Sequence, residues 1–216
     1  MGQKVHPISF RLGNTFSWKS RWYADQRSYS RNVLGDYRLR QLLHNKLGNA
    51  GLVTIDIERS LTSLSVVLVA SRPGVVIGKG GENLKLISQA IEKLVNTGKV
   101  KQHRVKIDIK VEEMKTPDLS AKLVAERIAD QLSKRYPHRR AVRQALDRVT
   151  QAGAEGIKIV LSGRIGGSEI GRTEKYTRGK VPTQTLRANL DYFQSPSLTR
   201  SGYVGVKVWI YKGEVQ

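Results

Sequence analysis

The chain of 216 residues is strongly basic: 38 Lys and Arg stand against 18 Asp and Glu, which gives a formal charge of +20, and cysteine is absent. Without cysteine, disulfides, thiolate metal sites and a cysteine nucleophile are excluded, and the longest apolar run, residues 66–70, is too short to cross a bilayer. A charge of this size favours a polyanionic partner, so we expect an intracellular protein that binds nucleic acid and not a membrane.

Residues 1–34 form a basic N-terminal arm that is rich in aromatic residues. The arm carries six Lys and Arg and a single acid, Asp25. Its six aromatic residues are Phe10, Phe16, Trp18, Trp22, Tyr23 and Tyr29. Basic side chains between aromatic rings suit phosphate contacts combined with base stacking. The same composition equally suits an arm whose rings pack on the next domain, and the sequence leaves both interpretations open.

Residues 35–113 are expected to form a compact unit of helices and strands. Leucines at helical spacing indicate the first helix, and alternating apolar residues indicate the strands. The expected elements are a helix from Asp36 to a glycine end at Gly48 or Gly51, strands at 52–59 and 64–70, a helix at 82–95 and a strand at 103–113. Each strand has one apolar face, so we expect helices to cover one face of the sheet.

Residues 114–216 are expected to form a second domain. A helix opens at Thr116-Pro117, where proline suits the first turn, and Tyr136-Pro137 ends it. The remaining expected elements are a helix at 139–153 and strands at 156–163, 186–193 and 203–213, with a Gly-rich charged stretch after the first of these strands. This order predicts an α+β protein of two domains, the second with two helices packed on a mainly antiparallel sheet.

The stretch VVIGKGGENL, residues 75–84, interrupts an apolar run with three glycines and a lysine. Its spacing fits neither the dinucleotide fingerprint nor the Walker loop. A later near-match, GGSEIGRT, has Arg172 in place of lysine and no following helix to hold a phosphate. The pattern that fits is G-x-x-G between two short helices, which lets an RNA backbone approach. In α-β-β-α-α-β order it predicts a type II KH domain, with an RNA-binding loop of Gly78, Lys79, Gly80 and Gly81.

A second basic feature lies where the two C-terminal helices meet, in KRYPHRRAVRQALDR. Arg139 and Arg143 are four residues apart and share a helix face, with Arg140 beside them, and we call these three residues the arginine ridge. Like charges at this spacing repel each other, and a solvated face usually carries mixed charges, so we interpret the ridge as facing phosphates. The scattered histidines and serines form no catalytic or metal-binding group, so we expect neither an enzyme nor a cofactor.

Taken together, these segments resemble the ribosomal protein S3 family of the small (30S) subunit, in its bacterial or organellar form. The segments that carry the resemblance are MGQKVHP, RPGVVIGKGG, LSAKLVAERIADQL, HRRAVRQAL, GAEGIKIVLSGRIGGSEIGRTE and GVKVWIYKGE. The resemblance implies a KH domain on the side of the subunit head where mRNA enters, and a C-terminal domain anchored in 16S-type rRNA. It also implies that the arginine ridge faces incoming mRNA and assists its unwinding. The single lysine of GKGG, where relatives often have two basic residues, implies a weaker grip on phosphate.

The resemblance also implies partners and further contacts. Additional rRNA contacts are expected at Lys4, Arg11, Lys19, Arg21, Arg164, Arg172, Lys175 and Arg178. The expected partners are rRNA, mRNA, ribosomal proteins ten and fourteen of the head and proteins four and five near the mRNA channel, in a cytoplasmic or organellar ribosome. The alternative is a free-standing KH protein that regulates RNA, which would tolerate a more nearly neutral surface. A nuclease would need paired carboxylates or histidines in a basic cleft.

Overall fold

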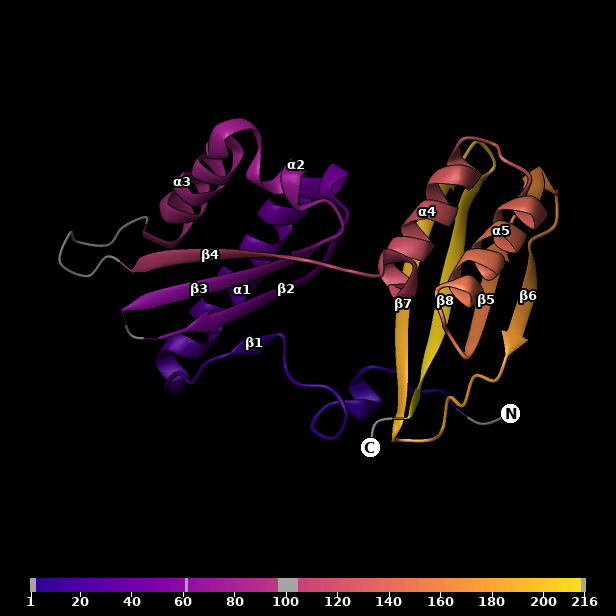
Figure 1. Cartoon of the computed structure of the whole chain (residues 1–216), viewed down its shortest axis with the longest axis horizontal. Coiled ribbons are helices and arrows are strands. Elements are labelled where there is room, and N and C mark those ends of the chain that lie inside the picture. The colour runs from indigo at the N-terminus through magenta and orange to yellow at the C-terminus, as the bar shows by residue number, and fades with distance from the viewer. Residues whose placement is uncertain (1–2, 61, 97–104, 215–216) are drawn as a thin grey trace. The chain divides into compact units, whose positions relative to one another are not determined.

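The computed structural model of the chain describes residues 3–60, 62–96 and 105–214, which form two compact units (Figure 1). The central unit comprises residues 18–115, and the terminal unit joins residues 1–17 to residues 116–216. The expected arm over residues 1–34 is therefore divided between the units and does not form a segment of its own.

The central unit is a four-stranded mixed sheet with three α-helices. Its elements are β1 (Ser20–Arg21), α1 (Gln26–Leu47), η2 (Gly48–Ala50), β2 (Leu52–Arg59), β3 (Ser63–Ala70), α2 (Pro73–Ile77), η3 (Lys79–Gly81), α3 (Glu82–Asn96) and β4 (Lys106–Glu113). The strand order is β1-β2-β3-β4, with β2 and β3 antiparallel and both outer pairs parallel. The predicted α-β-β-α-α-β order is therefore present. Residues 103 and 104 of the last expected strand lie outside the described residues.

Helix α1 begins at Gln26 and not at Asp36 as expected. Asp36 is buried inside the helix, where its carboxylate accepts hydrogen bonds from Trp22 Nε1 at 2.8 Å and from Arg59 Nε at 2.7 Å. Gly35 makes room for this contact, because a Cβ there would lie 3.2 Å from Arg59 Nη2. Asp36, where the sequence predicted the start of the helix, thus lies within α1 and binds Arg59 of β2.

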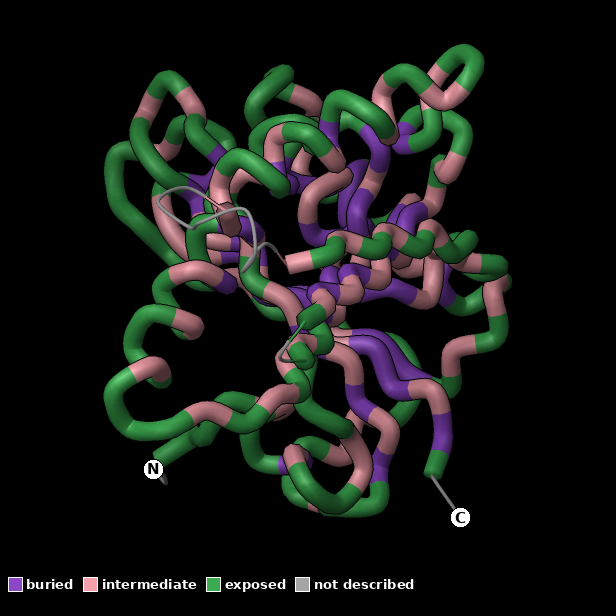
Figure 2. The backbone as a smooth tube through the Cα atoms, turned by 90° about the vertical axis from the view of Figure 1, so that its left-hand side faces the viewer, coloured by how far each residue is buried: buried purple, intermediate pink, exposed green. Residues whose placement is uncertain are grey.

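The core of the central unit lies between the helices and one face of the sheet. Leu39, Leu43 and Leu47 of α1 are at most 2% exposed, and they meet Ile87 and Ile91 of α3 in one cluster. Burying a side chain of this size contributes about 1.5–3 kcal/mol to stability. Figure 2 shows the buried residues as short stretches of the chain, with exposed residues both in the connecting segments and along the helices.

The terminal unit packs two α-helices on a four-stranded antiparallel sheet (Figure 1). Its elements are η1 (Ser9–Arg11), η5 (Pro117–Leu119), α4 (Ala121–Ser133), α5 (His138–Gln151), β5 (Gly156–Gly163), η6 (Ile165–Gly167), β6 (Arg172–Gly179), β7 (Ala188–Thr199) and β8 (Gly202–Glu214). The strand order is β6-β5-β8-β7. Pro117 opens a short 3-10 turn, and α4 starts after it, where Asp191 Oδ2 of β7 accepts a hydrogen bond from Ala121 N at 2.9 Å.

Two edge strands of the terminal unit differ from the sequence prediction. β6 lies in the Gly-rich stretch where no strand was expected, and it pairs with β5 along all its eight residues. β7 continues to Thr199 through Pro196, which an edge strand accepts because one side of its backbone has no partner strand. Within the described residues, no helix is long and apolar enough to span a membrane.

Candidate nucleic-acid interface

The glycine loop, Gly78 to Gly81, connects α2 to α3 and contains two kinds of glycine. Gly78 has φ 74° and ψ 176°, a region essentially restricted to glycine, and a Cβ there would lie 2.6 Å from Cβ of Asn83. Gly80 and Gly81 also have positive φ, but a Cβ on either would meet no atom within 4 Å. Gly78 is therefore required by the fold of the loop itself, while Gly80 and Gly81 leave open surface for another molecule.

The loop presents its lysine on a fixed support. Lys79 and Gly80 are exposed, while Val76 before them is buried in the core. Asn83 Nδ2 donates a hydrogen bond to the carbonyl of Val75 at 2.9 Å, which ties the start of α3 to α2. An ammonium group held beside open backbone suits a phosphate group of a single strand.

The arginine ridge lies on the outer face of α5. The opposite face of this helix packs into the core through Ala141, Val142, Ala145 and Val149. Arg139, Arg140 and Arg143 are exposed, and none of them has a carboxylate partner among the described residues. The guanidinium of Arg140 lies 5.6 Å from the ring centre of Tyr136.

The acid nearest to the ridge in sequence is already paired. Asp147 forms an ion pair with Arg178 of β6, so the positive charge of the ridge is not neutralised from its own helix. Exposed guanidinium groups that have no carboxylate partner among the described residues suit phosphate oxygens, to which arginine donates two parallel hydrogen bonds.

A polar network centred on Glu174 of β6 supports the start of α5. The Glu174 carboxylate accepts hydrogen bonds at 2.6 Å from Tyr176 Oη and from Arg172 Nε. These two bonds, with the Tyr176 bond the larger cause, lower the pKa of Glu174. His138 Nε2 lies 3.2 Å from Glu174 Oε2, at ion-pair distance, although no hydrogen bond forms there.

The same network reaches the ridge through Tyr176. Burial is the main cause that raises the pKa of Tyr176, and its hydrogen bond to Glu174 adds to the effect. Arg139 acts on the same hydroxyl in the opposite direction, both as a nearby charge and as a hydrogen-bond partner. Tyr176 therefore links the first ridge arginine to the Glu174 carboxylate.

Arg11 has to be removed from the expected rRNA contacts, because its side chain is fully buried. Its guanidinium donates to five backbone carbonyls: Pro7 at 2.9 Å, Pro182 at 3.3 Å, Thr183 at 3.0 Å, Thr185 at 2.8 Å and Ala188 at 2.9 Å. The residue ties the N-terminal segment to the chain before β7 and has no surface left for RNA.

The other expected rRNA contacts are all exposed, but they are divided between the two units. Lys19 and Arg21 belong to the central unit, where Arg21 pairs with Glu58 at 2.6 Å. The contacts in the terminal unit are Lys4, Arg164, Arg172, Lys175 and Arg178. They stay candidate contacts, and no single surface is assigned to the whole set.

Lys158 is a candidate that the sequence analysis missed. The residue lies on β5, and its pKa is lowered first by burial and then by the charges of Lys4 and Lys175. Its ammonium group lies 5.2 Å from the ring centre of Trp209. Lys158 and Lys175 lie on the paired strands β5 and β6, and Lys4 comes from the N-terminal segment, so lysines distant in sequence are close enough for their charges to interact.

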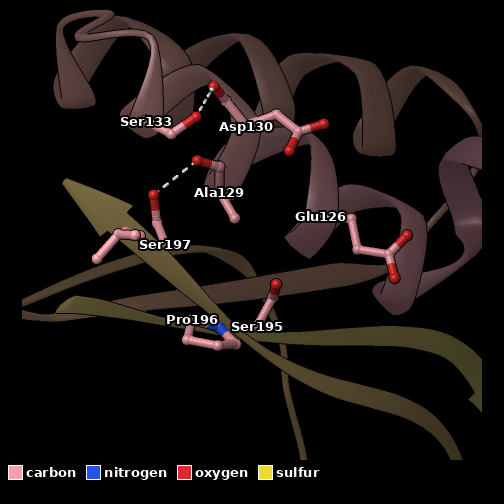
Figure 3. A pocket seen from close by; sticks show the side chains of 8 residues that line it. Glu126, Ala129, Asp130, Ser133, Ser195, Pro196 and Ser197 are labelled. Carbon is pink, nitrogen blue, oxygen red and sulfur yellow. Dashed lines mark hydrogen bonds between the residues drawn. The ribbon is translucent and has the colours of Figure 1, made fainter. Parts of the chain in front are cut away.

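A pocket of about 150 Å³ between α4 and β7 does not extend the basic surfaces (Figure 3). Its carboxylates are Glu126 and Asp130, whose charge is opposite to what RNA requires. Ser197 Oγ donates to the carbonyl of Ala129 at 2.7 Å, and Ser133 Oγ donates to that of Asp130 at 2.8 Å. These hydroxyls therefore hold backbone together. The described residues contain no group of three or more His, Asp or Glu that could hold a metal ion.

Comparison with known proteins identifies the family. A KH domain model matches residues 38–119, and a model of the ribosomal protein S3 C-terminal domain matches residues 128–210. The chain is 46% identical to small ribosomal subunit protein uS3 of Caldicellulosiruptor bescii over 215 residues, 100% of this chain and 94% of that protein. This chain belongs to the ribosomal protein S3 family. The chain is also 47% identical to the relative of the same name from Hydrogenovibrio crunogenus over 214 residues, and 46% identical to that from Shewanella oneidensis over 215 residues. Each of these two matches includes 90% of the relative's length.

Membership of the S3 family supports two of the sequence predictions directly. The central unit contains the KH domain, and the terminal unit contains the S3 C-terminal domain, so the predicted α+β class with these two domains is confirmed. The family is a structural one, so the expectation of a structural and not an enzymatic role is confirmed as well.

Proposed function

We propose that this S3-family chain is a structural constituent of the head of the small ribosomal subunit, that it binds 16S-type rRNA, and that it guides mRNA where the message enters. The arginine ridge carries this proposal. Arg139, Arg140 and Arg143 are exposed, have no carboxylate partner among the described residues, and stand on a helix whose other face is core. The partners in this assignment are the rRNA, the mRNA and the neighbouring ribosomal proteins ten, fourteen, four and five, in a cytoplasmic ribosome or, as the alternative, an organellar one.

The ridge acts by electrostatic stabilisation and not by chemistry. A guanidinium that contacts the phosphates of an unpaired strand lowers the free energy of that strand relative to the duplex, because the contact releases counterions and adds charge-assisted hydrogen bonds. Three such contacts on a fixed helix favour opening of base pairs at the point where the message meets the protein.

The glycine loop contributes a second contact to RNA in the central unit. Its open backbone at Gly80 and Gly81 and the ammonium group of Lys79 suit one phosphate group of a single strand. Since the loop has a single lysine and the ridge has three arginines, we assign this loop a supporting role and the ridge the main one.

Sedimentation distinguishes this proposal from a free-standing KH protein. The tagged chain is expressed in cells, and lysates are separated on sucrose gradients at low and moderate salt. We expect nearly all of the protein to co-sediment with small subunits at about one copy per subunit. A protein found mainly at the top of the gradient, or on RNA outside ribosomes, would favour the regulatory alternative.

A further inference from the structure

The N-terminal half of α1 carries an apolar stripe on its outer face. The stripe consists of Tyr29, Val33, Leu34 and Tyr37, which are 57%, 42%, 56% and 64% exposed. Tyr29, Val33 and Tyr37 follow one another at four-residue spacing, so they share a face and extend over about 12 Å of helix. Single exposed apolar residues are ordinary, but a contiguous group of this kind marks an interaction site.

The stripe is held rigidly. Asp36, inside the same helix turns, is tied to both Trp22 and Arg59, and the Trp22 ring lies 5.4 Å from that of Tyr29. Packing of α1 on the core begins at Asp36 and continues with Leu39. The stripe is therefore anchored at its Tyr37 end by this packing and at its Tyr29 end by the Trp22 ring, which reduces the entropy that a partner has to remove on binding.

The stripe is also separate from the glycine loop. Helix α1 continues from Tyr29 to Leu47 and then into η2, against which α2 packs. At 1.5 Å per residue, Tyr29 lies roughly 27 Å along the helix from Leu47. The stripe and the loop that follows α2 are thus near opposite ends of α1, and one short RNA segment would not occupy both.

Basic residues beside the stripe define the charge of its partner. Arg27, Arg31 and Arg38 are exposed on the same part of α1, and they have no carboxylate partner among the described residues. Asp36, the carboxylate within this helix, is buried and bound to Arg59. The partner surface must therefore be apolar opposite the stripe and negative beside it.

The centre of the stripe favours a protein over RNA. Bases stack on flat aromatic rings, whereas the centre of the stripe consists of the exposed aliphatic side chains of Val33 and Leu34. A helix face with apolar residues at this spacing fits a hydrophobic groove of another protein, and tyrosine and arginine are enriched in such interfaces. We propose that the apolar stripe of α1 is a docking surface for a protein with an apolar groove bordered by acidic side chains.

Site-specific photo-crosslinking in cells tests this proposal. A benzophenone amino acid replaces Leu34 in the full-length chain, and a matched control replaces Asn45, which is exposed on the other half of the same helix. We expect a crosslink from position 34 to a protein peptide that contains Asp or Glu, and none to that peptide from position 45. In an R27E/R31E background the crosslink should fall at least five-fold, whereas R27K/R31K should retain it.

Three results would overturn the proposal: a crosslink from position 34 to RNA, no crosslink from position 34, or a protein crosslink unaffected by charge reversal. The test is independent of the function proposed above. Leu34→Glu should remove docking and leave the affinity of the purified chain for a single-stranded RNA oligonucleotide unchanged, while loss of the ridge should do the opposite.

Discussion

The glycine loop and the arginine ridge suit an RNA backbone in opposite ways. The loop offers open main chain and one ammonium group, because two of its glycines leave space where side chains would stand. The ridge offers three long side chains on a helix with a buried opposite face. The glycine loop therefore depends on its backbone conformation, whereas the arginine ridge depends on the groups that its side chains contact.

The contacts that hold the glycine loop in place also differ from those that hold the arginine ridge. The loop is fixed by the conformation of Gly78 and by one amide bond from Asn83 to Val75. The ridge is supported by a second element, β6, through Tyr176 and Glu174. We therefore expect a change of Gly78 to act through folding, and changes of the ridge arginines themselves to act on RNA.

The largest expected effect is on the free energy of unfolding, and it compares a buried arginine with an exposed one. Arg11→Met removes five charge-assisted hydrogen bonds and leaves buried carbonyls without donors, so it should lower the free energy of unfolding of the terminal unit by at least ~3 kcal/mol. Alanine at Arg140, which is exposed, should change it by less than about 0.5 kcal/mol.

Trp209 reports on this unit alone once Trp18 and Trp22 are replaced by Phe, and urea unfolding is followed by its fluorescence. Arg11→Lys serves as the control that keeps the charge but not the forked geometry. Equal destabilisation by Arg11→Met and by alanine at Arg140 would contradict the distinction between a buried and an exposed arginine.

A second prediction concerns the two kinds of glycine in the loop. Gly78→Ala should destabilise the central unit by about 2–3 kcal/mol, because alanine is strained at this φ and ψ and its Cβ would meet Asn83. Gly80→Ala, with open space around its Cβ, should cost about 1 kcal/mol through its positive φ alone. Urea unfolding followed through the fluorescence of Trp18 and Trp22, both in the central unit, in a chain with Trp209 replaced by Phe, measures both; a reversed order of costs would contradict the account of the loop.

A third prediction uses pH to test the support of the ridge. Because the folded chain lowers the pKa of Glu174, its carboxylate contributes stability above the ordinary glutamate pKa, and this contribution is lost as the pH falls through the depressed value. Glu174→Gln should therefore cost about 1 kcal/mol at neutral pH and flatten the acid side of the stability curve. Asp118→Asn, in a more exposed pair with Arg127, is the control and should have a smaller effect. An unchanged pH curve in Glu174→Gln would argue against the network.

The smallest expected effect concerns Lys79. Lys79→Ala should reduce the slope of log K against log salt for a single-stranded oligonucleotide by about 0.7, which corresponds to one lost phosphate contact. Lys93→Ala on α3 serves as a comparison. Filter binding over a range of salt concentrations gives the slope, and an unaltered slope would mean that Lys79 contacts no phosphate.

The sequence predicted most of the fold because the apolar patterns are regular. The strand at 52–59 and the strand at 156–163 have the expected bounds. β6 could not be predicted in this way: its residues RTEKYTRG contain little apolar character, since the strand lies at a sheet edge, and its pairing with β5 is a tertiary property.

The candidate site was predictable only in part, because sequence gives charge but not environment. The glycine loop and the ridge were found from spacing and charge, and both lie on the surface. Arg11 has the same charge as the ridge arginines, yet five carbonyls from segments distant in sequence bury it. The aromatic residues of the N-terminal arm also have different environments, although the arm seemed uniform in the sequence. Trp22 donates a hydrogen bond to Asp36, whereas Tyr23 is 91% exposed.

The central claim is that the arginine ridge faces message, and unwinding of a structured mRNA tests it most directly. Ribosomes carrying R139A/R140A/R143A are compared with ribosomes carrying R187A, an exposed arginine that pairs with Glu214 and is not a candidate RNA contact, after sedimentation has shown normal assembly of both. We predict slower unwinding of the structured message with the ridge variant, and normal translation of an unstructured one. Normal unwinding on fully assembled ridge-variant subunits, or failure of these subunits to assemble, would contradict the account and assign the three arginines to rRNA.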